Sequence, residues 1–218
     1  MSHNDSDTMP HPRSKVQSMT SQELSTAPNT MRNVSFAVVD FETTGLNPEI
    51  DRIVQLAAVI VNGEGHIVDS FDTIVRPESP DEYQHGAEHI HGISAEQVSS
   101  GMPLRKALER LWSINAGHVF TAHNAAFDLG FLHAESKRVG LEGHVDVHVD
   151  TLELARRTTG TDTTRRHNLF ALCEHYGIER DKVHDAKSDA TATAQLLMHL
   201  IKELGVETPD QVAELFVP

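Results

Sequence analysis

The stretch VSFAVVDFETTG, residues 34–45, joins an apolar run typical of a buried β-strand to two acidic residues at its end. Successive side chains of a strand point to opposite faces, so Asp40 and Glu42, two positions apart, project from the same side. Two like charges are therefore brought together. A carboxylate pair before a polar, glycine-containing turn suits a hard divalent cation such as Mg²⁺ or Mn²⁺, because these ions prefer oxygen ligands.

A single cation needs further ligands, and two other acidic positions are candidates. Asp128, in AHNAAFD, falls in the first turn of an expected helix, with Asn124 as a candidate N-cap. Asp189, in HDAKSD, borders the apolar face of another expected helix, where an uncompensated charge is costly. Simpler interpretations exist, since Asp40 and Glu42 could face water at an exposed strand end and Asp128 could complement a helix dipole.

His184 stands five residues before Asp189. On one continuous helix the two side chains would lie about 140° apart and could not share a site. If His184 instead lies in the loop leading into the helix, its imidazole can reach over the site. Histidine is the side chain best suited to take a proton from water near neutral pH. The alternative is a solvated loop histidine, one of 15 histidines in the chain.

The hydrophobic pattern predicts an α/β fold with a central mixed five-stranded sheet flanked by helices. Three strands are expected first, and the NGEG segment predicts a hairpin between the second and third. A connector spans residues 76–102. The expected strands are 34–42, 53–61, 66–75, 118–123 and 145–149, and the expected helices are 103–112, 125–140, 151–158, 168–178 and 185–204.

The ends of the chain differ from its centre. Residues 1–33 are rich in Ser, Thr, Asn, Pro and Met and predict a disordered N-terminal tail, residues 34–205 a folded domain, and residues 206–218 a short C-terminal arm. No apolar run is long enough for a membrane span, and no export signal is visible. Cys173 has apolar neighbours at helical spacing, which favours a buried thiol in a cytoplasmic protein.

The formal net charge of −14 argues against a protein that coats long stretches of nucleic acid, because such proteins usually carry a basic face. It does not argue against a protein that grips only a chain end, with metal ions supplying the positive charge. The net charge therefore limits the length of nucleic acid that the protein can contact, but it does not exclude nucleic acid as a ligand.

The segments DFETTG, AHNAAFD and HDAKSD, in this order and at these separations, resemble the three motifs of the DnaQ-like (DEDDh) 3′→5′ exonucleases. HIHGIS and HNLFALCEHYGI are similar to segments of the epsilon proofreading subunits of bacterial DNA polymerase III. The resemblance covers about residues 35–204, which makes 34–205 the exonuclease domain. It implies an RNase H-like fold, two divalent cations (Mg²⁺ or Mn²⁺), and five catalytic residues: Asp40, Glu42, Asp128 and Asp189 as metal ligands and His184 as general base.

The same resemblance implies hydrolysis of nucleoside monophosphates from single-stranded or frayed DNA 3′ ends, in proofreading or repair. The expected substrate contacts are Thr43, Thr44, Leu46, His91 and Asn124. Phe127 could add an apolar surface for a base or could belong to the core. His91 lies where the family places a histidine near the nucleotide, and a loop-bracing histidine is the alternative.

Two alternatives share these residues. An exoribonuclease of the oligoribonuclease or RNase T type would use the same five side chains on RNA 3′ ends, and a catalytically silent binding module would keep only the fold. A DNA polymerase or a sliding clamp is a candidate partner. QVAELF, residues 211–216, loosely resembles a clamp-binding peptide, although a terminal amphipathic helix needs no partner. The short segment after the last expected helix favours a standalone or accessory enzyme.

Overall fold

Three antiparallel strands form the centre of the sheet, as the apolar runs predict. In the computed structural model, which describes residues 16–17, 30–79, 83–159 and 166–217, β2 (Ser35–Thr43) pairs with β3 (Ile53–Asn62). Strand β3 also pairs with β4 (Ile67–Arg76). Nine of the ten residues of β3 are buried because layers of the fold cover both of its faces, which explains why it reads as a continuous apolar run.

Shorter parallel strands extend the sheet on both sides. β6 (Val119–Ala122) pairs with β2, and β8 (Val149–Asp150) pairs with β6. β5 (Met102–Pro103) pairs with the end of β4, so the order is β5-β4-β3-β2-β6-β8. The fold class is as predicted, but the prediction of five strands was wrong because the two residues of β5 are too few for a strand periodicity.

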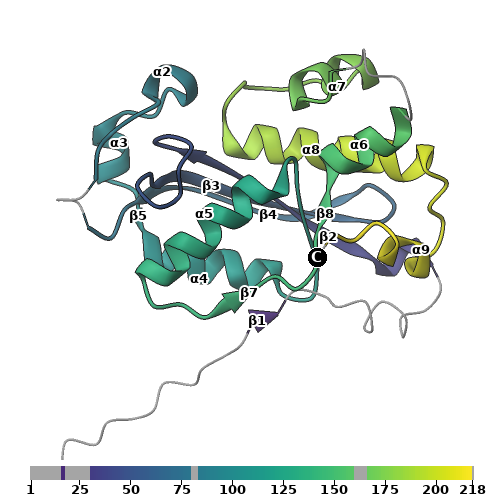
Figure 1. Cartoon of the computed structure of the whole chain (residues 1–218), viewed down its shortest axis with the longest axis horizontal. Coiled ribbons are helices and arrows are strands. Elements are labelled where there is room, and N and C mark those ends of the chain that lie inside the picture. Colours follow the sequence, from purple (N-terminus) through teal and green to yellow (C-terminus); the bar gives the residue numbers. More distant parts are fainter. Residues whose placement is uncertain (1–15, 18–29, 80–82, 160–165, 218) are drawn as a thin grey trace, which may run out of the picture.

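Helices cover the two faces of the sheet (Figure 1). On one face lie α6 (Thr151–Thr159), α7 (Leu169–Tyr176) and α8 (Ala186–Glu203); on the other lie α4 (Leu104–Asn115) and α5 (Ala125–Arg138). Alternate residues of β2 serve the two layers. Phe36 and Val38 pack in the α8 layer, whereas Ala37 and Val39 pack in the α4–α5 layer. By this alternation Asp40 and Glu42 belong to the α8 face.

The predicted connector contains structure that periodicity did not reveal. Two short helices, α2 (Glu88–His91) and α3 (Ala95–Ser99), lie between β4 and β5. Ser94 and Gln97 form a capping box at the start of α3, so local capping rather than an apolar pattern defines it. Residues 76–102 do connect β4 to β5, as predicted, but the two short helices within them were not predicted.

Most of the predicted N-terminal tail, 1–15 and 18–29, lies outside the described residues. Within the described part, β1 (Val16–Gln17) pairs in parallel with β7 (Gly143–His144), and Met31–Asn33 form a turn of 3₁₀ helix before β2.

The C-terminal segment packs against the domain. In and after α9 (Pro209–Ala213), Val212 and Leu215 lie in the same core as α8, and Val217 exchanges two backbone hydrogen bonds with His148. The side-chain oxygen of Gln211 accepts from the backbone N–H groups of residues 207 and 208. The side chains that a clamp-binding peptide would present are thus occupied within the fold.

Two further sequence observations concern burial. Cys173 is buried in the α7–α8 layer, as predicted, and burial raises the pKa of its thiol. Among the helices of the described residues, none is both long and apolar enough to cross a membrane.

Helix α8 anchors the layer that carries part of the candidate site, so its packing is testable. Leu200 is fully buried between α8 and the sheet. Truncation to Ala leaves a cavity, and Leu200→Ala should lower the free energy of unfolding by about 2–5 kcal/mol. The neighbouring Gln195 is exposed. Gln195→Ala should change stability by less than about 0.5 kcal/mol in the same urea titration. Equal effects of the two substitutions would contradict this packing.

Candidate active site

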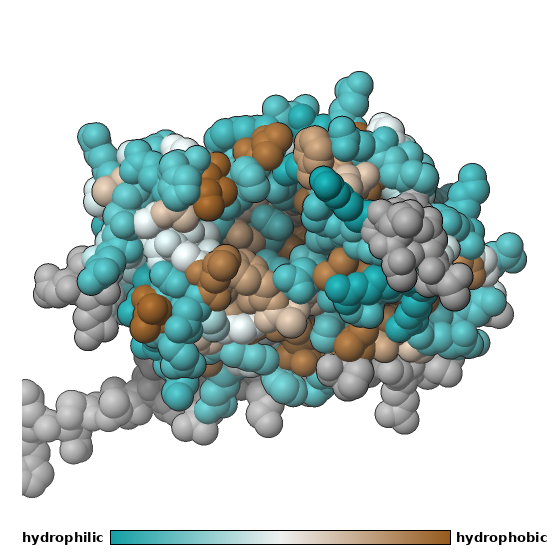
Figure 2. Space-filling view, turned by 45° about the horizontal axis from the view of Figure 1, so that its top comes forward, coloured by the Kyte–Doolittle hydropathy of each residue, from teal (hydrophilic) through white to brown (hydrophobic). Residues whose placement is uncertain are grey.

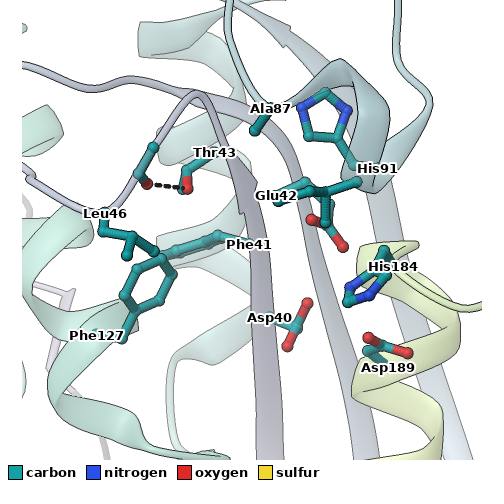
Figure 3. A pocket seen from close by; sticks show the side chains of 12 residues that line it. Asp40, Phe41, Glu42, Thr43, Leu46, Ala87, His91, Phe127, His184 and Asp189 are labelled. Atoms are coloured by element: carbon teal, nitrogen blue, oxygen red, sulfur yellow. Dashed lines mark hydrogen bonds between the residues drawn. The ribbon is translucent and has the colours of Figure 1, made fainter.

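Strand β2 presents Asp40 and Glu42 toward α8, where its pairing changes. The antiparallel register with β3 runs from Ser35 to Glu42 and shifts between Glu42 and Thr43. The parallel pairing with β6 already stops at Val38. Past that residue one side of β2 is open to other elements. The alternation predicted from sequence is confirmed, since both carboxylates face the same pocket (Figure 3).

The loop before α8 supplies His184. Helix α8 begins at Ala186, with Asp185 as N-cap, so His184 lies outside the helix and has φ +55°. Gln55 of β3 fixes this helix start: its amide nitrogen donates to Asp185 Oδ2 at 3.3 Å, and its oxygen accepts from the Ala186 N–H at 3.2 Å. The condition under which His184 and Asp189 can share a site is therefore met.

Glu42, His184 and Asp189 offer ligand atoms that all lie within 4.8 Å of one another. These residues come from β2, the loop before α8 and the first turn of α8. Figure 3 shows their side chains converging, with Asp40 beside them. An oxygen- and nitrogen-rich cluster of this kind can hold a divalent cation.

Asp128 approaches from the other helical layer. It is buried in the first turn of α5, and the nearby backbone amide of Phe41 on β2 opposes the rise in the pKa of its carboxyl. Its charge acts strongly on Asp40. The structure thus brings all four predicted acids to one end of β2, although Asp128 does not line the pocket that holds the other three.

The start of α5 is capped differently from the prediction. Asn124 precedes the helix with φ +66°, but its side chain makes no capping hydrogen bond. Asp150 at the end of β8 performs this role, accepting from the N–H groups of Asn124 at 3.0 Å and Ala125 at 3.1 Å. Asn124 is thus the N-cap residue, as predicted, but a carboxylate 26 residues along the chain, and not its own side chain, accepts from the free N–H groups.

The pKa values of all four acids of the site are raised. Burial, followed by the charge of Asp128, raises the pKa of Asp40 well above its ordinary value. Burial, followed by the charge of Asp189, raises the pKa of Glu42 to about 7. Burial likewise raises the pKa values of Asp128 and Asp189. A cation among these groups would favour their ionised forms.

One basic side chain lies against this cluster. The Arg180 guanidinium pairs with Asp189, with Nη2 at 2.5 Å and Nε at 3.1 Å from Oδ1. Its charge acts against the burial that raises the pKa of Asp189. The sequence analysis did not single out Arg180, because its position in a loop four residues before His184 carries no recognisable pattern.

The pocket beside the acids has a volume of ≈320 Å³ and combines carboxylates with apolar side chains. Its surroundings form part of the hollowed, mixed polar and apolar surface seen in Figure 2. Leu46 is 84% exposed and Ile90 is 48% exposed, so apolar surface is available at its rim. The lining residues are Asp40, Phe41, Glu42, Thr43, Gly45, Leu46, Ala87, Ile90, His91, Phe127, His184 and Asp189.

Three of the predicted substrate contacts, Thr43, Leu46 and His91, line this pocket, and Thr44 and Asn124 do not. The Thr44 hydroxyl donates to Asp51 at 3.1 Å and accepts from the Arg52 N–H at 3.0 Å, so it braces the turn after β2. The Thr43 hydroxyl donates to the Gly45 carbonyl at 2.6 Å (Figure 3).

His91 has the loop-bracing role that was one of its two interpretations. Its Nε2 lies 3.2 Å from the Gly86 carbonyl, and its Nδ1 accepts from the Ile93 N–H at 3.0 Å. Burial lowers the pKa of the imidazole, which favours the neutral ring. Both ring nitrogens of His91, which is only 2% exposed, therefore hold the α2 loop against the pocket.

The residues that sequence reasoning missed act through long-range contacts. Gln55 holds the start of α8, Asp150 holds the start of α5, and Ile90 extends the apolar rim. A signal exists for Asp150, because it lies between an expected strand and an expected helix, where side chains of neighbouring elements meet. Gln55 was detectable as the polar residue in an otherwise apolar strand.

These features define a site in which several buried carboxylates meet at the end of one strand, with donor atoms that could hold a divalent cation. The exonuclease family RNase_T has a model that matches residues 37–197. This chain belongs to that exonuclease family, and its resemblance to the DnaQ-like enzymes is confirmed.

Relatives in sequence are PolC-type DNA polymerases III. The protein of Oceanobacillus iheyensis is 36% identical over 170 residues, which cover 78% of this chain and 12% of the polymerase. The protein of Thermotoga maritima is 31% identical over 191 residues, which cover 86% of this chain and 14% of the polymerase. The chain thus spans only about an eighth of the length of these relatives.

Solved structures share the fold. Exonuclease X in complex with 5′ overhanging duplex DNA has a TM-score of 0.60 and 25% identity, covering 83% of this chain and 98% of that one. The nuclease domain of 3′hExo, a DEDDh family member bound to rAMP, has a TM-score of 0.67 and 18% identity, covering 78% of this chain and 92% of that one. Exonuclease I of E. coli with a dT13 oligonucleotide has a TM-score of 0.65 and 20% identity, covering 79% of this chain and 42% of that one.

The raised pKa of Glu42 makes stability depend on pH when metal is removed. Between its ordinary value of 4.5 and its folded value of about 7, the folded protein holds a proton on Glu42 that the unfolded chain has lost. The stability contributed by this proton is present at low pH and is lost as pH rises through about 7. In EDTA, Glu42→Gln should therefore gain stability relative to the wild type as pH rises across this window.

Thermal unfolding in EDTA from pH 5 to pH 8 would measure this difference. Glu49→Gln is the control, since Glu49 is exposed and lies outside the pocket. A constant difference between Glu42→Gln and the wild type across the series would contradict a protonated Glu42.

Proposed function

We propose that this chain is a 3′→5′ exonuclease that releases nucleoside monophosphates from DNA 3′ ends, in proofreading or repair. The observation that carries the proposal is the convergence of Glu42, His184 and Asp189 within 4.8 Å, with Asp40 beside them in one pocket. DNA as the substrate is supported by the PolC-type polymerases among the relatives and by the DNA-bound states of Exonuclease X and Exonuclease I.

Asp40, Glu42, Asp128 and Asp189 would hold two divalent cations, Mg²⁺ or Mn²⁺. The donor set fits such ions, because it consists of carboxylates whose pKa values are raised by burial and, for Asp40, Glu42 and Asp128, also by neighbouring acids. When bound, the cations supply activation of the attacking water and stabilisation of the leaving 3′ oxygen.

The chain's own residues perform the remaining tasks. His184 would take the proton from the attacking water, and its exposed ring can pass that proton to solvent. Leu46 and Ile90 offer apolar surface on which an unpaired terminal base can rest, and Phe127 also lines the pocket. The Thr43 hydroxyl bond to Gly45 keeps the turn beside β2 in shape.

The same side chains serve an exoribonuclease, and a silent binding module would share the fold. We place RNA second because the PolC-type relatives are DNA polymerases. A DNA polymerase is the proposed working partner, either as a separate protein or within a longer chain. The buried Val212 and Leu215 give no support to clamp binding through the C-terminal segment. A cytoplasmic location stays a prediction.

The proposal is tested with 3′-labelled and 5′-labelled single strands of matched DNA and RNA. The wild type with Mg²⁺ or Mn²⁺ should release the 3′ label first as a mononucleotide, with DNA cleaved faster than RNA. Asp40→Ala should reduce the rate at least about 100-fold, because it removes a proposed metal ligand. Asp69→Ala, which removes an exposed acid from β4, is the matched control. Faster loss of RNA would favour the exoribonuclease, and no hydrolysis would favour the silent module.

The role of His184 is tested separately. His184→Gln should lower kcat by about 10²–10⁴-fold with little change in KM, because a general base acts on the chemical step. The acidic side of the pH–rate profile should flatten in this variant. His66→Gln, on the exposed β3–β4 turn, should leave rate and profile unchanged. A His184→Gln enzyme that keeps the wild-type rate and profile would refute the assignment.

A further inference from the structure

Arg180 forms a buried ion pair at the edge of the carboxylate cluster. Its Nη2 and Nε both donate to Oδ1 of Asp189, at 2.5 Å and 3.1 Å. The two side chains are only 9% and 10% exposed. A pair this buried differs from surface ion pairs, because water does not screen its charges.

The charge of Arg180 acts on more than its partner. It also opposes the rise in the pKa of Asp40, and after Lys182, whose charge has the larger effect there, it opposes the rise in the pKa of Glu42. Lys182, the next basic residue of the same loop, is 63% exposed and lies 3.6 Å from Asp185. Arg180 therefore provides a fixed, buried positive charge to the cluster, whereas Lys182 provides a solvated one.

We propose that Arg180 is a built-in counter-ion that competes with a divalent cation for Asp189 and so weakens cation binding until substrate arrives. This inference rests on the proposed function, since it takes Asp189 as a metal ligand. Both hydrogen bonds of Arg180 go to one carboxylate oxygen of Asp189, which reduces the charge that this group offers to any other cation. A dication bound close by is also repelled by the guanidinium.

Charge balance links this competition to the substrate. Four ionised carboxylates and two divalent cations cancel, so the guanidinium leaves the loaded site with one positive charge. A phosphodiester carries one negative charge and would complete the balance. Cation binding and nucleotide binding should then strengthen each other, as linkage requires of two ligands that share a coupling free energy.

An alternative role for Arg180 predicts the opposite effect of its removal on cation affinity. If the guanidinium only orients Asp189 as a ligand, its removal would loosen the carboxylate and weaken cation binding. Direct measurement of Mn²⁺ affinity in the absence of nucleic acid therefore separates competition from orientation.

Calorimetric titration of the metal-free full chain with Mn²⁺ at pH 8 gives this affinity. Arg180→Gln should bind Mn²⁺ at least about tenfold more tightly than the wild type, because a buried positive charge has been removed. Arg180→Lys keeps the charge and should stay near the wild type. Lys182→Gln makes the same charge change at an exposed position of the same loop and should shift the affinity by less than about threefold.

A second titration tests the coupling. Thymidine 5′-monophosphate should strengthen Mn²⁺ binding in the wild type and do so less in Arg180→Gln. Unchanged or weaker Mn²⁺ binding by folded Arg180→Gln would overturn the inference. If that variant does not fold, Arg180→Lys decides: wild-type affinity supports the inference, and a loss of more than about tenfold overturns it.

The two proposals fail in different ways. A wild-type chain that cleaves DNA and binds Mn²⁺, with no tightening in Arg180→Gln, overturns only the role of Arg180. A wild-type chain that neither binds Mn²⁺ nor cleaves overturns the proposed function as well.

Discussion

The mutual repulsion of four carboxylates at the end of β2 is the constraint on which the candidate site depends. Burial and neighbouring acids raise the pKa values of Asp40, Glu42 and Asp128, so the folded chain holds these groups together at a cost in free energy. Such a cluster persists only when the surrounding structure holds its members in place. The same repulsion would favour the binding of divalent cations, because a bound cation would remove it.

The elements around the cluster oppose this repulsion through contacts that are distant in sequence. Gln55 joins β3 to the start of α8, and Asp150 joins β8 to the start of α5. Each fixes the N-terminus of a helix that carries one of the acids in its first turn. The acids can converge because these helix starts meet where β2 has lost its pairing with β6.

Local rules predicted the residues that belong to one element, and they failed where another element intervenes. The period of two placed Asp40 and Glu42 together, and helix geometry required His184 to precede α8. The capping of α5 was missed because its acceptor, Asp150, comes from a different strand. The hydroxyl of Thr44 is used by the turn itself, which no residue pattern indicates.

The acidic surface and the pocket together favour attack at chain ends. A formal charge of −14 repels a phosphate backbone that runs along the protein, so long contacts with nucleic acid add little affinity. Cations held by the acids would attract a phosphate next to a cavity of ≈320 Å³ with the apolar Leu46 and Ile90 at its rim. A terminal nucleotide can bring its base to that rim and its phosphate to the acids. In the proposed reaction, an internal nucleotide would bring flanking phosphates on both sides toward a chain of negative net charge, and this difference would favour the end.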